Sequence, residues 1–446
     1  MTRPRSIMLF ISLLVMTSVL AVACGTIEPD SLAFADVDAD QTTLRIATSR
    51  IEGFEAAIAS WEDDHPTVDV EIVLDSSDDH HEWIRNGMSG QVDIVAFEGE
   101  YGAEVRSLPE RFVDLRELGL GDLADDFLPV RWEEGTAEGG ELIGLPVDVD
   151  AQVLIVRRDL LRPSTTRNLL NASGWCDVIQ AGNDFANESG VAFFADGDEV
   201  LQAILSQSRL SWVAPDGSLD PGAETELLWA WDLAMLTVGA DSVGTTPCPE
   251  LTDRGTIARD LTPGEAVWNT EIASDQFAAV IAQWSTRDLI SQAYPESGGR
   301  WLTIPLPIDQ SFGPAGTSSE GGLHFGVSAD SANIDIALDF LLTITNPVTQ
   351  QSTFADGLGP LPAIRSAYTD GSVARVDDGF LVGRPTVGAA WSAAVAGRSE
   401  LIASAERPIV VSALSDALAR VQADLDSPEE AWDNAVRTII EELDQR

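Results

Sequence analysis

The chain has 446 residues, more than a single hydrophobic core usually organises, so we expect at least two lobes. Its 73 acidic residues against 26 basic ones give a formal net charge of −47, and every one of the basic residues is arginine. This much negative charge repels phosphates and anionic lipid headgroups, which excludes nucleic-acid binding and indicates a solvated acidic surface.

The N-terminus has the features of an export signal. Two arginines precede an apolar run from Ile7 to Leu20, and small residues lead into Cys24. The sequence around Cys24 also resembles a bacterial lipobox, in which the cysteine becomes the acylated first residue of the mature protein. We therefore expect a lipoprotein signal peptide at 1–23, lipidation at Cys24, an acidic tether at 24–42 and attachment to the extracytoplasmic face of a bacterial cell membrane. The alternative is a plain secretory signal with an incidental cysteine.

Strands and helices alternate after the tether. A β run at 44–48 precedes apolar residues at helical spacing from Ile51 to Trp61, a helix that His65 and Pro66 should end. Further strands are expected at 68–72 and 93–97, which together predict a parallel sheet in a layered α/β lobe. Ligands in such lobes lie beyond the carboxyl ends of strands. The candidate residues there are Ser49, Arg50, Glu98 and Glu100.

A short acidic stretch, 78–82, contains His80 and His81 and has the composition of a metal cluster. Adjacent side chains on an extended segment point to opposite faces, and the surroundings are hydrophilic. We therefore expect a solvated loop and no metal site.

The segment 139–161 reads GGELIGLPVDVDAQVLIVRRDLL. It resembles family 1 extracellular solute-binding proteins of the maltodextrin-binding type. The resemblance continues in order through 278–284, through 304–307 with 321–327, through 335–363, and through 427–432. It implies that 139–161 contains the first crossing between two lobes, and that Asp150, four places after the proline, contacts the ligand. It also implies that Trp284 ends a strand as a ligand-stacking aromatic.

The fold class implied is α/β: a two-lobe, periplasmic-binding-protein-like (type II) fold with three hinge crossings. The crossings are expected near 144–152, 307–322 and 357–364. The lobe boundaries are expected at 43–148 and 318–360 for lobe I, and at 149–317 and 361–446 for lobe II. The segment from 384 to 408 is longer than the usual family ending, and Trp391 in it is a candidate to replace the family's C-terminal aromatic.

Sugar sites combine aromatic faces with charged or amide groups that bind adjacent hydroxyls. Asp148 and Asp150 share one side of an extended segment by their two-residue spacing, and Arg50 could balance them. Gly321 and Gly322 would let backbone amides approach a ligand. The full set of expected ligand contacts is Ser49, Arg50, Glu98, Glu100, Asp148, Asp150, Gln152, Trp284, Gly321, Gly322 and His324. The alternatives are core packing for Trp284, solvated acids for the aspartates and a simple turn for the glycines.

Two cysteines other than Cys24 are present, Cys176 and Cys248. An exported protein meets an oxidising compartment, in which these two permit one internal disulfide. The alternative is a pair of buried free thiols, because spacing alone does not show proximity.

The sequence has no G-x-S-x-G elbow, no H-E-x-x-H and no phosphate loop, so we expect no enzymatic activity, no catalytic residue, no metal and no cofactor. The expected function is capture of a small solute, a sugar or oligosaccharide, by hinge closure of a monomer that delivers it to the permease subunits of an ABC importer. The first alternative is the same fold binding a cationic solute such as a polyamine or betaine. The second is a surface hydrolase or a scaffold lipoprotein.

Overall fold

A computed structural model of the chain describes residues 42–445, apart from 52, 75, 89, 100, 208–211, 215–216, 252–253, 309–320, 356–358 and 398–404. The expected signal peptide, the lipidated Cys24 and the tether up to residue 41 lie outside the described residues. Thr42, which we had included in the tether, is the first residue of a strand. From Thr42 onward the chain forms one compact unit.

The first sheet has the strand order β2-β1-β3-β9-β4. Its strands are β1 (Thr42–Thr48), β2 (Val68–Leu74), β3 (Ile94–Glu98), β4 (Leu145–Pro146) and β9 (Leu323–Val327). β1 is parallel to β2 and β3, as predicted, whereas β9 is antiparallel to both β3 and β4. The sheet is therefore mixed where the sequence analysis expected a parallel one, because β9 comes from a distant part of the chain and enters in the opposite direction.

The second sheet has the strand order β10-β8-β5-β7-β6. Its strands are β5 (Val153–Arg157), β6 (Ala192–Phe194), β7 (Phe277–Ala282), β8 (Trp301–Pro305) and β10 (Leu381–Val382). Along β5, Val153 and Ile155 enter one hydrophobic cluster while Leu154 and Val156 enter another. Successive side chains of a strand point to opposite faces, so this continuous apolar run is explained by helices that cover both sides of the sheet.

Helices cover both sheets. In the first half of the chain they are α1 (Glu55–Asp64), α2 (Ser77–Arg85), α3 (Gly102–Val105), α4 (Pro129–Glu134), α5 (Pro163–Leu170), α6 (Trp175–Ser189), α7 (Gly197–Gln207) and α8 (Pro221–Val238), with short 3-10 turns at Pro109–Arg111 and Leu120–Asp126. In the second half they are α9 (Ala266–Ala273), α10 (Thr286–Ala293), α11 (Ile334–Ile344), α12 (Pro347–Ala355), α13 (Arg365–Thr369), α14 (Ser372–Arg375), α15 (Val387–Ala396), α16 (Arg407–Gln422) and α17 (Pro428–Leu443), with a 3-10 turn at Pro295–Ser297. Among the described residues, none of these helices is both long and apolar enough to cross a membrane.

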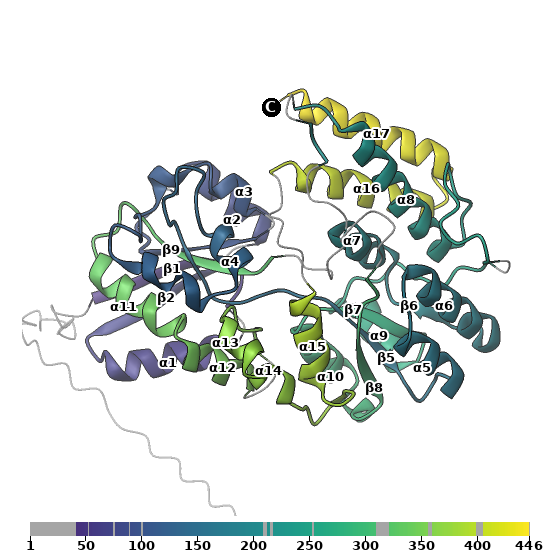
Figure 1. The fold of residues 1–446 in the computed structure, drawn as a ribbon, viewed down its shortest axis with the longest axis horizontal. Coiled ribbons are helices and arrows are strands. Elements are labelled where there is room, and N and C mark those ends of the chain that lie inside the picture. The colour runs from purple at the N-terminus through teal and green to yellow at the C-terminus, as the bar shows by residue number, and fades with distance from the viewer. Residues whose placement is uncertain are drawn as a thin grey trace, which may run out of the picture. The chain divides into compact units, whose positions relative to one another are not determined.

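Local sequence explains several helix ends. α1 ends at His65, just before Pro66, as a proline requires of the residue that precedes it. α17 begins at the predicted capping box, in which Ser427 and Glu430 each bond the backbone of the other. α1 packs beside α11, and α17 runs beside α16 (Figure 1).

The segments that join the two sheets lie side by side. The backbone N–H of Val149 donates to Leu361 O at 2.8 Å, and the N–H of Asp150 donates to Gly321 O at 3.0 Å. Residues from each of the three predicted crossings therefore meet at 149–150. The lobe boundaries themselves stay a prediction.

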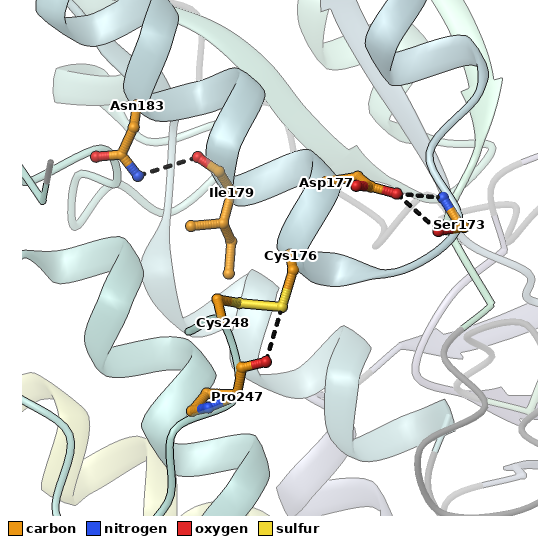
Figure 2. The surroundings of a disulfide bond; sticks show 7 residues. All are labelled: Ser173, Cys176, Asp177, Ile179, Asn183, Pro247 and Cys248. Carbon is orange, nitrogen blue, oxygen red and sulfur yellow. Dashed lines mark hydrogen bonds between the residues drawn. A yellow bond between two sulfur atoms is a disulfide. The ribbon is translucent and has the colours of Figure 1, made fainter. Parts of the chain in front are cut away.

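Figure 2 shows a disulfide between Cys176 and Cys248, 72 residues apart in the sequence. Cys176 is in the first turn of α6, and its Sγ also contacts Pro247 O at 3.1 Å. The bond ties α6 to the segment that follows α8.

Candidate functional site

Polar side chains meet at the carboxyl ends of β1 and β3, as predicted. Ser49 Oγ donates a hydrogen bond to Glu98 Oε1, and the backbone N–H of Glu98 donates to His81 Nε2 at 3.3 Å. The ring of Tyr101 stacks on His81 with 3.9 Å between centroids. Glu100, the fourth residue predicted at this edge, lies outside the described residues.

The interpretation of 78–82 as a solvated loop is wrong. Ser76 caps a helix there, α2, by accepting a hydrogen bond from the backbone N–H of Asp79. His80 and His81 are both only 2% exposed, and His80 Nε2 bonds Ala96 O at 2.7 Å. A helix turns adjacent side chains by about 100° and not to opposite faces, so both imidazoles can reach the sheet. No group of three metal-ligating side chains is found in the described part of the chain.

Arg50 joins the end of β1 to the first crossing. Its Nη2 lies 2.9 Å from Asp148 Oδ2 and 3.0 Å from Asp150 Oδ2. Asp148 is completely buried, and its Oδ1 accepts the backbone N–H of Leu323 at 2.6 Å. Burial raises the pKa of Asp148 to about 6, against the opposing charge of Arg50. The predicted pairing of these three residues is present, and neither carboxylate is a freely solvated acid.

Arg131, on α4, supports this cluster from the core, and the sequence analysis missed it. The side chain is fully buried and ion-paired to Glu134, one turn further along α4. Its Nε donates to Asp148 O at 3.1 Å and its Nη2 to Leu323 O at 3.2 Å. Because the guanidinium has five fixed donors, it can hold the first crossing and β9 in one arrangement.

His324, which the sequence analysis placed among the ligand contacts, lies in the core. The side chain is fully buried, its ring stacks on Phe97, and both ring nitrogens bond Arg131. It alternates along β9 with apolar residues on a strand that is buried throughout, so its role in ligand contact stays a prediction. Gln152 is also buried, at 5% exposure, next to the start of β5.

Gly321 and Gly322 lie where backbone segments come very close to one another. Gly321 has φ +96, and a Cβ on it would lie 2.6 Å from the Cα of Gly99. Gly322 has φ +136, and a Cβ there would lie 2.7 Å from Asp148 O. A side chain at Gly321 would press on Gly99, which follows β3, and one at Gly322 would press on Asp148 in the first crossing. Glycine is also favoured at both positions because their φ is positive.

Trp284 follows β7 and is 4% exposed. It lines a pocket of about 570 Å³ together with residues of α1, α11 and α12. Its indole Nε1 is buried and has no hydrogen-bond partner among the described residues. Trp391 is 1% exposed on α15, which packs on β5 and β8, and its role as a replacement stacking aromatic stays a prediction.

Asp196 was also missed. It lies between the end of β6 and the start of α7, a position beyond the carboxyl end of a strand. The sequence analysis names candidates at such positions only in the first lobe. It is 8% exposed, and its Oδ1 accepts the backbone N–H of Asp198 at 2.9 Å. Burial raises the pKa of Asp196 to about 7, with further contributions from the charges of Asp198 and Asp260.

Comparisons with known proteins agree on one fold. No family model matches the chain. A lactose-binding protein of Rhizobium radiobacter is 26% identical over 294 residues, a match that spans 62% of this chain and 63% of the relative, just under two thirds of its length. A crystal structure of an extracellular solute-binding protein of family 1 superposes with a TM-score of 0.70 at 20% identity, over 90% of this chain and all of the other.

The GacH receptor of Streptomyces glaucescens, solved without ligand and with acarbose, superposes with a TM-score of 0.67 at 20% identity over 90% of this chain and 99% of the other. The chain has the fold of the family 1 extracellular solute-binding proteins. The fold class predicted from the resemblance is confirmed: two mixed five-stranded sheets, each covered by helices, in the two-lobe arrangement of that family.

The buried acid Asp196 leads to a prediction about pH. Its pKa is higher in the folded protein than in the unfolded chain, so the folded state binds the extra proton between about pH 4 and 7. The stability that this proton confers is present below that window and is lost as the pH rises through it. Asp196→Asn should therefore raise the free energy of unfolding at pH 8 while leaving it unchanged at pH 4.

One pKa unit corresponds to about 1.4 kcal/mol, so the rise of about three units predicts a gain of at most about 4 kcal/mol at pH 8. Urea denaturation at both pH values measures it. Asp184→Asn, an exposed acid on α6, is the matched control and should change neither value by more than about 0.5 kcal/mol. An equal gain at pH 4 and pH 8 would show that charge burial is not the cause.

Proposed function

We propose that this chain is the substrate-binding protein of an ABC importer and captures a sugar or oligosaccharide between its two lobes. Support comes from the fold it shares with solute-binding proteins and from the likeness to a lactose-binding protein. In this mechanism the open lobes admit the solute, contacts to both lobes stabilise the closed arrangement, and the permease subunits recognise that arrangement.

The observation that carries the mechanism is the meeting of three crossing segments at 149–150, where Val149 bonds Leu361 and Asp150 bonds Gly321. The carboxylate of Asp150 also bonds Arg50 at the end of β1. Short crossings that lie side by side, joined here by antiparallel bridges, let two rigid bodies rotate about a few backbone torsions, as hinge closure requires. No chemical step and no cofactor enters this function.

The charge of the cluster favours a neutral solute over a cation. Asp148 and Asp150 would attract a polyamine or betaine only if their charge were available, and Arg50 lies within 3.0 Å of both. A cationic ligand would have to displace an arginine from two carboxylates, whereas a sugar hydroxyl can bond beside it. The remaining parts of the proposal are a lipid anchor at Cys24, an extracytoplasmic location, permease subunits as partners and a monomeric state.

The test is binding of lactose, maltose and acarbose to the purified protein. A ligand at a hundredfold its dissociation constant adds about 2.7 kcal/mol to the free energy of unfolding, which a thermal-shift assay detects. Trp284→Ala should weaken the binding about tenfold, because it removes the aromatic face. Trp229→Ala, on α8 and outside the pocket, is the control and should bind normally. A shift with spermidine or betaine, and none with sugars, would overturn the sugar assignment.

A further inference from the structure

One buried glutamine bonds two of the three crossing segments. Gln350 is on α12, a helix that packs against α1 and α11 beside the first sheet, and its side chain is only 4% exposed. Its Nε2 donates to Pro146 O at 3.1 Å, and its Oε1 accepts the backbone N–H of Ala363 at 2.7 Å. Pro146 ends β4 within the first expected crossing, and Ala363 belongs to the third. A single side chain therefore links the two crossings.

An amide satisfies both of these backbone groups at once. Pro146 presents a carbonyl oxygen, which requires a donor, and Ala363 presents an N–H, which requires an acceptor. Glutamine supplies a donor and an acceptor in one plane, and the opposite orientation of its amide would set oxygen against oxygen. Because a buried backbone group without a partner is unfavourable, the fold favours keeping both bonds.

The two crossings are also joined without Gln350. The N–H of Val149 donates to Leu361 O at 2.8 Å, which connects the segments directly. The carbonyl of Ala363 accepts the N–H of Leu128, the residue before α4, at 2.9 Å. Two separate connections, one through Gln350 and one through Val149, resist sliding or twisting of one crossing against the other. The first and third crossings should therefore leave the first lobe as one unit, with bending confined to residues nearer β5.

The start of the second crossing is bonded from the other lobe. Gln207, the last residue of α7, is also 4% exposed, and its Nε2 donates to Pro307 O at 2.8 Å. Its Oε1 accepts the indole N–H of Trp175, in the first turn of α6, at 2.8 Å. A buried amide thus holds crossing segments at each lobe, which leaves the bending residues between the two amides.

We propose that Gln350 is a positioning residue of the hinge, which couples the first and third crossings so that the lobes rotate about both together. The proposal rests on the hinge closure proposed above and adds the residue that defines its axis at the first lobe. Without this coupling the lobes adopt more relative orientations, and only a fraction of these brings both lobes onto one solute. The apparent affinity for the solute falls by that fraction.

The experiment removes the amide and measures both the hinge and the binding. Gln350→Met keeps the length of the side chain but loses both bonds. Gln351→Met, at the next residue of α12, is the matched control, because the amide of Gln351 bonds Ser366 Oγ at an exposed position. In the full chain, hydrogen exchange of the segment 147–152 should become at least tenfold faster in Gln350→Met, while that of β7 changes less than twofold. Calorimetric titration with lactose and with maltose should show a threefold or greater loss of affinity for Gln350→Met and less than a twofold change for Gln351→Met.

Gln350→Glu tests the coupling with almost no change of shape. A protonated carboxyl has an O–H for Pro146 O and a carbonyl for the N–H of Ala363, whereas a carboxylate repels Pro146 O. At pH 5 the buried carboxyl is protonated, because burial disfavours the charged form, and at pH 9 it ionises. The sugar affinity of this variant should be within twofold of the native protein at pH 5 and at least threefold weaker than the native protein at pH 9.

The outcomes separate this proposal from the proposed function. Exchange of 147–152 is measured without sugar, so if the native protein binds no sugar the proposed function fails, and the exchange rates alone decide whether Gln350 couples the crossings. Unchanged exchange at 147–152 in Gln350→Met overturns the coupling. Faster exchange with native sugar affinity also overturns the proposal, because Gln350 then serves stability and not binding. Should Gln350→Met unfold, Gln350→Glu decides by the difference between pH 5 and pH 9.

Discussion

Arg131→Met should lower the free energy of unfolding by about 3–5 kcal/mol, because it removes the arginine that is ion-paired with the buried carboxylate of Glu134. Glu134 is 2% exposed, and Arg131 has no exposed surface. The substitution also removes the donors to two backbone carbonyls, Asp148 O in the first crossing and Leu323 O at the start of β9. Urea denaturation of the native and variant proteins at pH 7 measures the loss.

Two further variants identify the cause. Arg437→Met removes an exposed arginine of α17 and should change the free energy of unfolding by less than about 0.5 kcal/mol. Adding Glu134→Leu to Arg131→Met removes the uncompensated charge and should restore a large part of the loss, since a buried ion pair can be replaced by apolar residues at little cost. If the double variant is no more stable than Arg131→Met, the loss comes from packing and not from the charge of Glu134.

Elements with a strong local signal could be predicted from the sequence. The strands at β1, β3 and β7 are short apolar runs bounded by polar residues, and α17 has both a capping box and an apolar stripe that includes the buried Trp432. In these places local preference and tertiary burial agree. The same agreement explains why Ser49 and Glu98 were correctly placed together. Ser49 follows β1, Glu98 is the last residue of β3, and these two parallel strands end at the same edge of the sheet.

Local sequence is least informative where a polar residue is buried by partners that are distant in the sequence. His80 is buried because Ala96 O accepts from it, and His324 because Arg131 lies against it, 193 residues away. Hydrophilic composition around His80 indicated solvent, and nothing local contradicted it. Arg131 itself looks like an ordinary surface residue of an acidic helix. Its burial depends on β9, which only the tertiary structure brings next to α4.

The predicted site residues fall into two separate groups in the structure, which the sequence alone did not show. Asp148, Asp150, Gly321 and Gly322 were predicted to bind a ligand, and the structure uses much of their hydrogen-bonding capacity to hold the crossings together. Trp284 instead lines a pocket together with serine and threonine residues of α1, α11 and α12, where no candidate was named. Threonine and serine at helical spacing carry little signal in a sequence, because their usual place is a solvated helix face.

The second large effect concerns the disulfide between Cys176 and Cys248. The cross-link closes a loop of 72 residues, which contains α7 and α8 and much of the cluster that covers the second sheet. In the chain-entropy model, a loop of this length stabilises the folded state by about 4 kcal/mol, because the unfolded chain loses conformations. The variant Cys176→Ser/Cys248→Ser should therefore unfold at a much lower urea concentration than the native protein.

Reduction distinguishes the effect of losing the disulfide from the effect of replacing the cysteine side chains. Dithiothreitol should lower the stability of the native protein to about 1 kcal/mol above that of the double serine variant and should leave the variant itself unchanged. Cys248 is 4% exposed and packs against apolar residues, so the serine hydroxyl adds a cost of about 1 kcal/mol to the variant alone. A loss below about 1 kcal/mol on reduction would mean that the unfolded chain already holds these segments together, and that the loop model does not apply to this lobe.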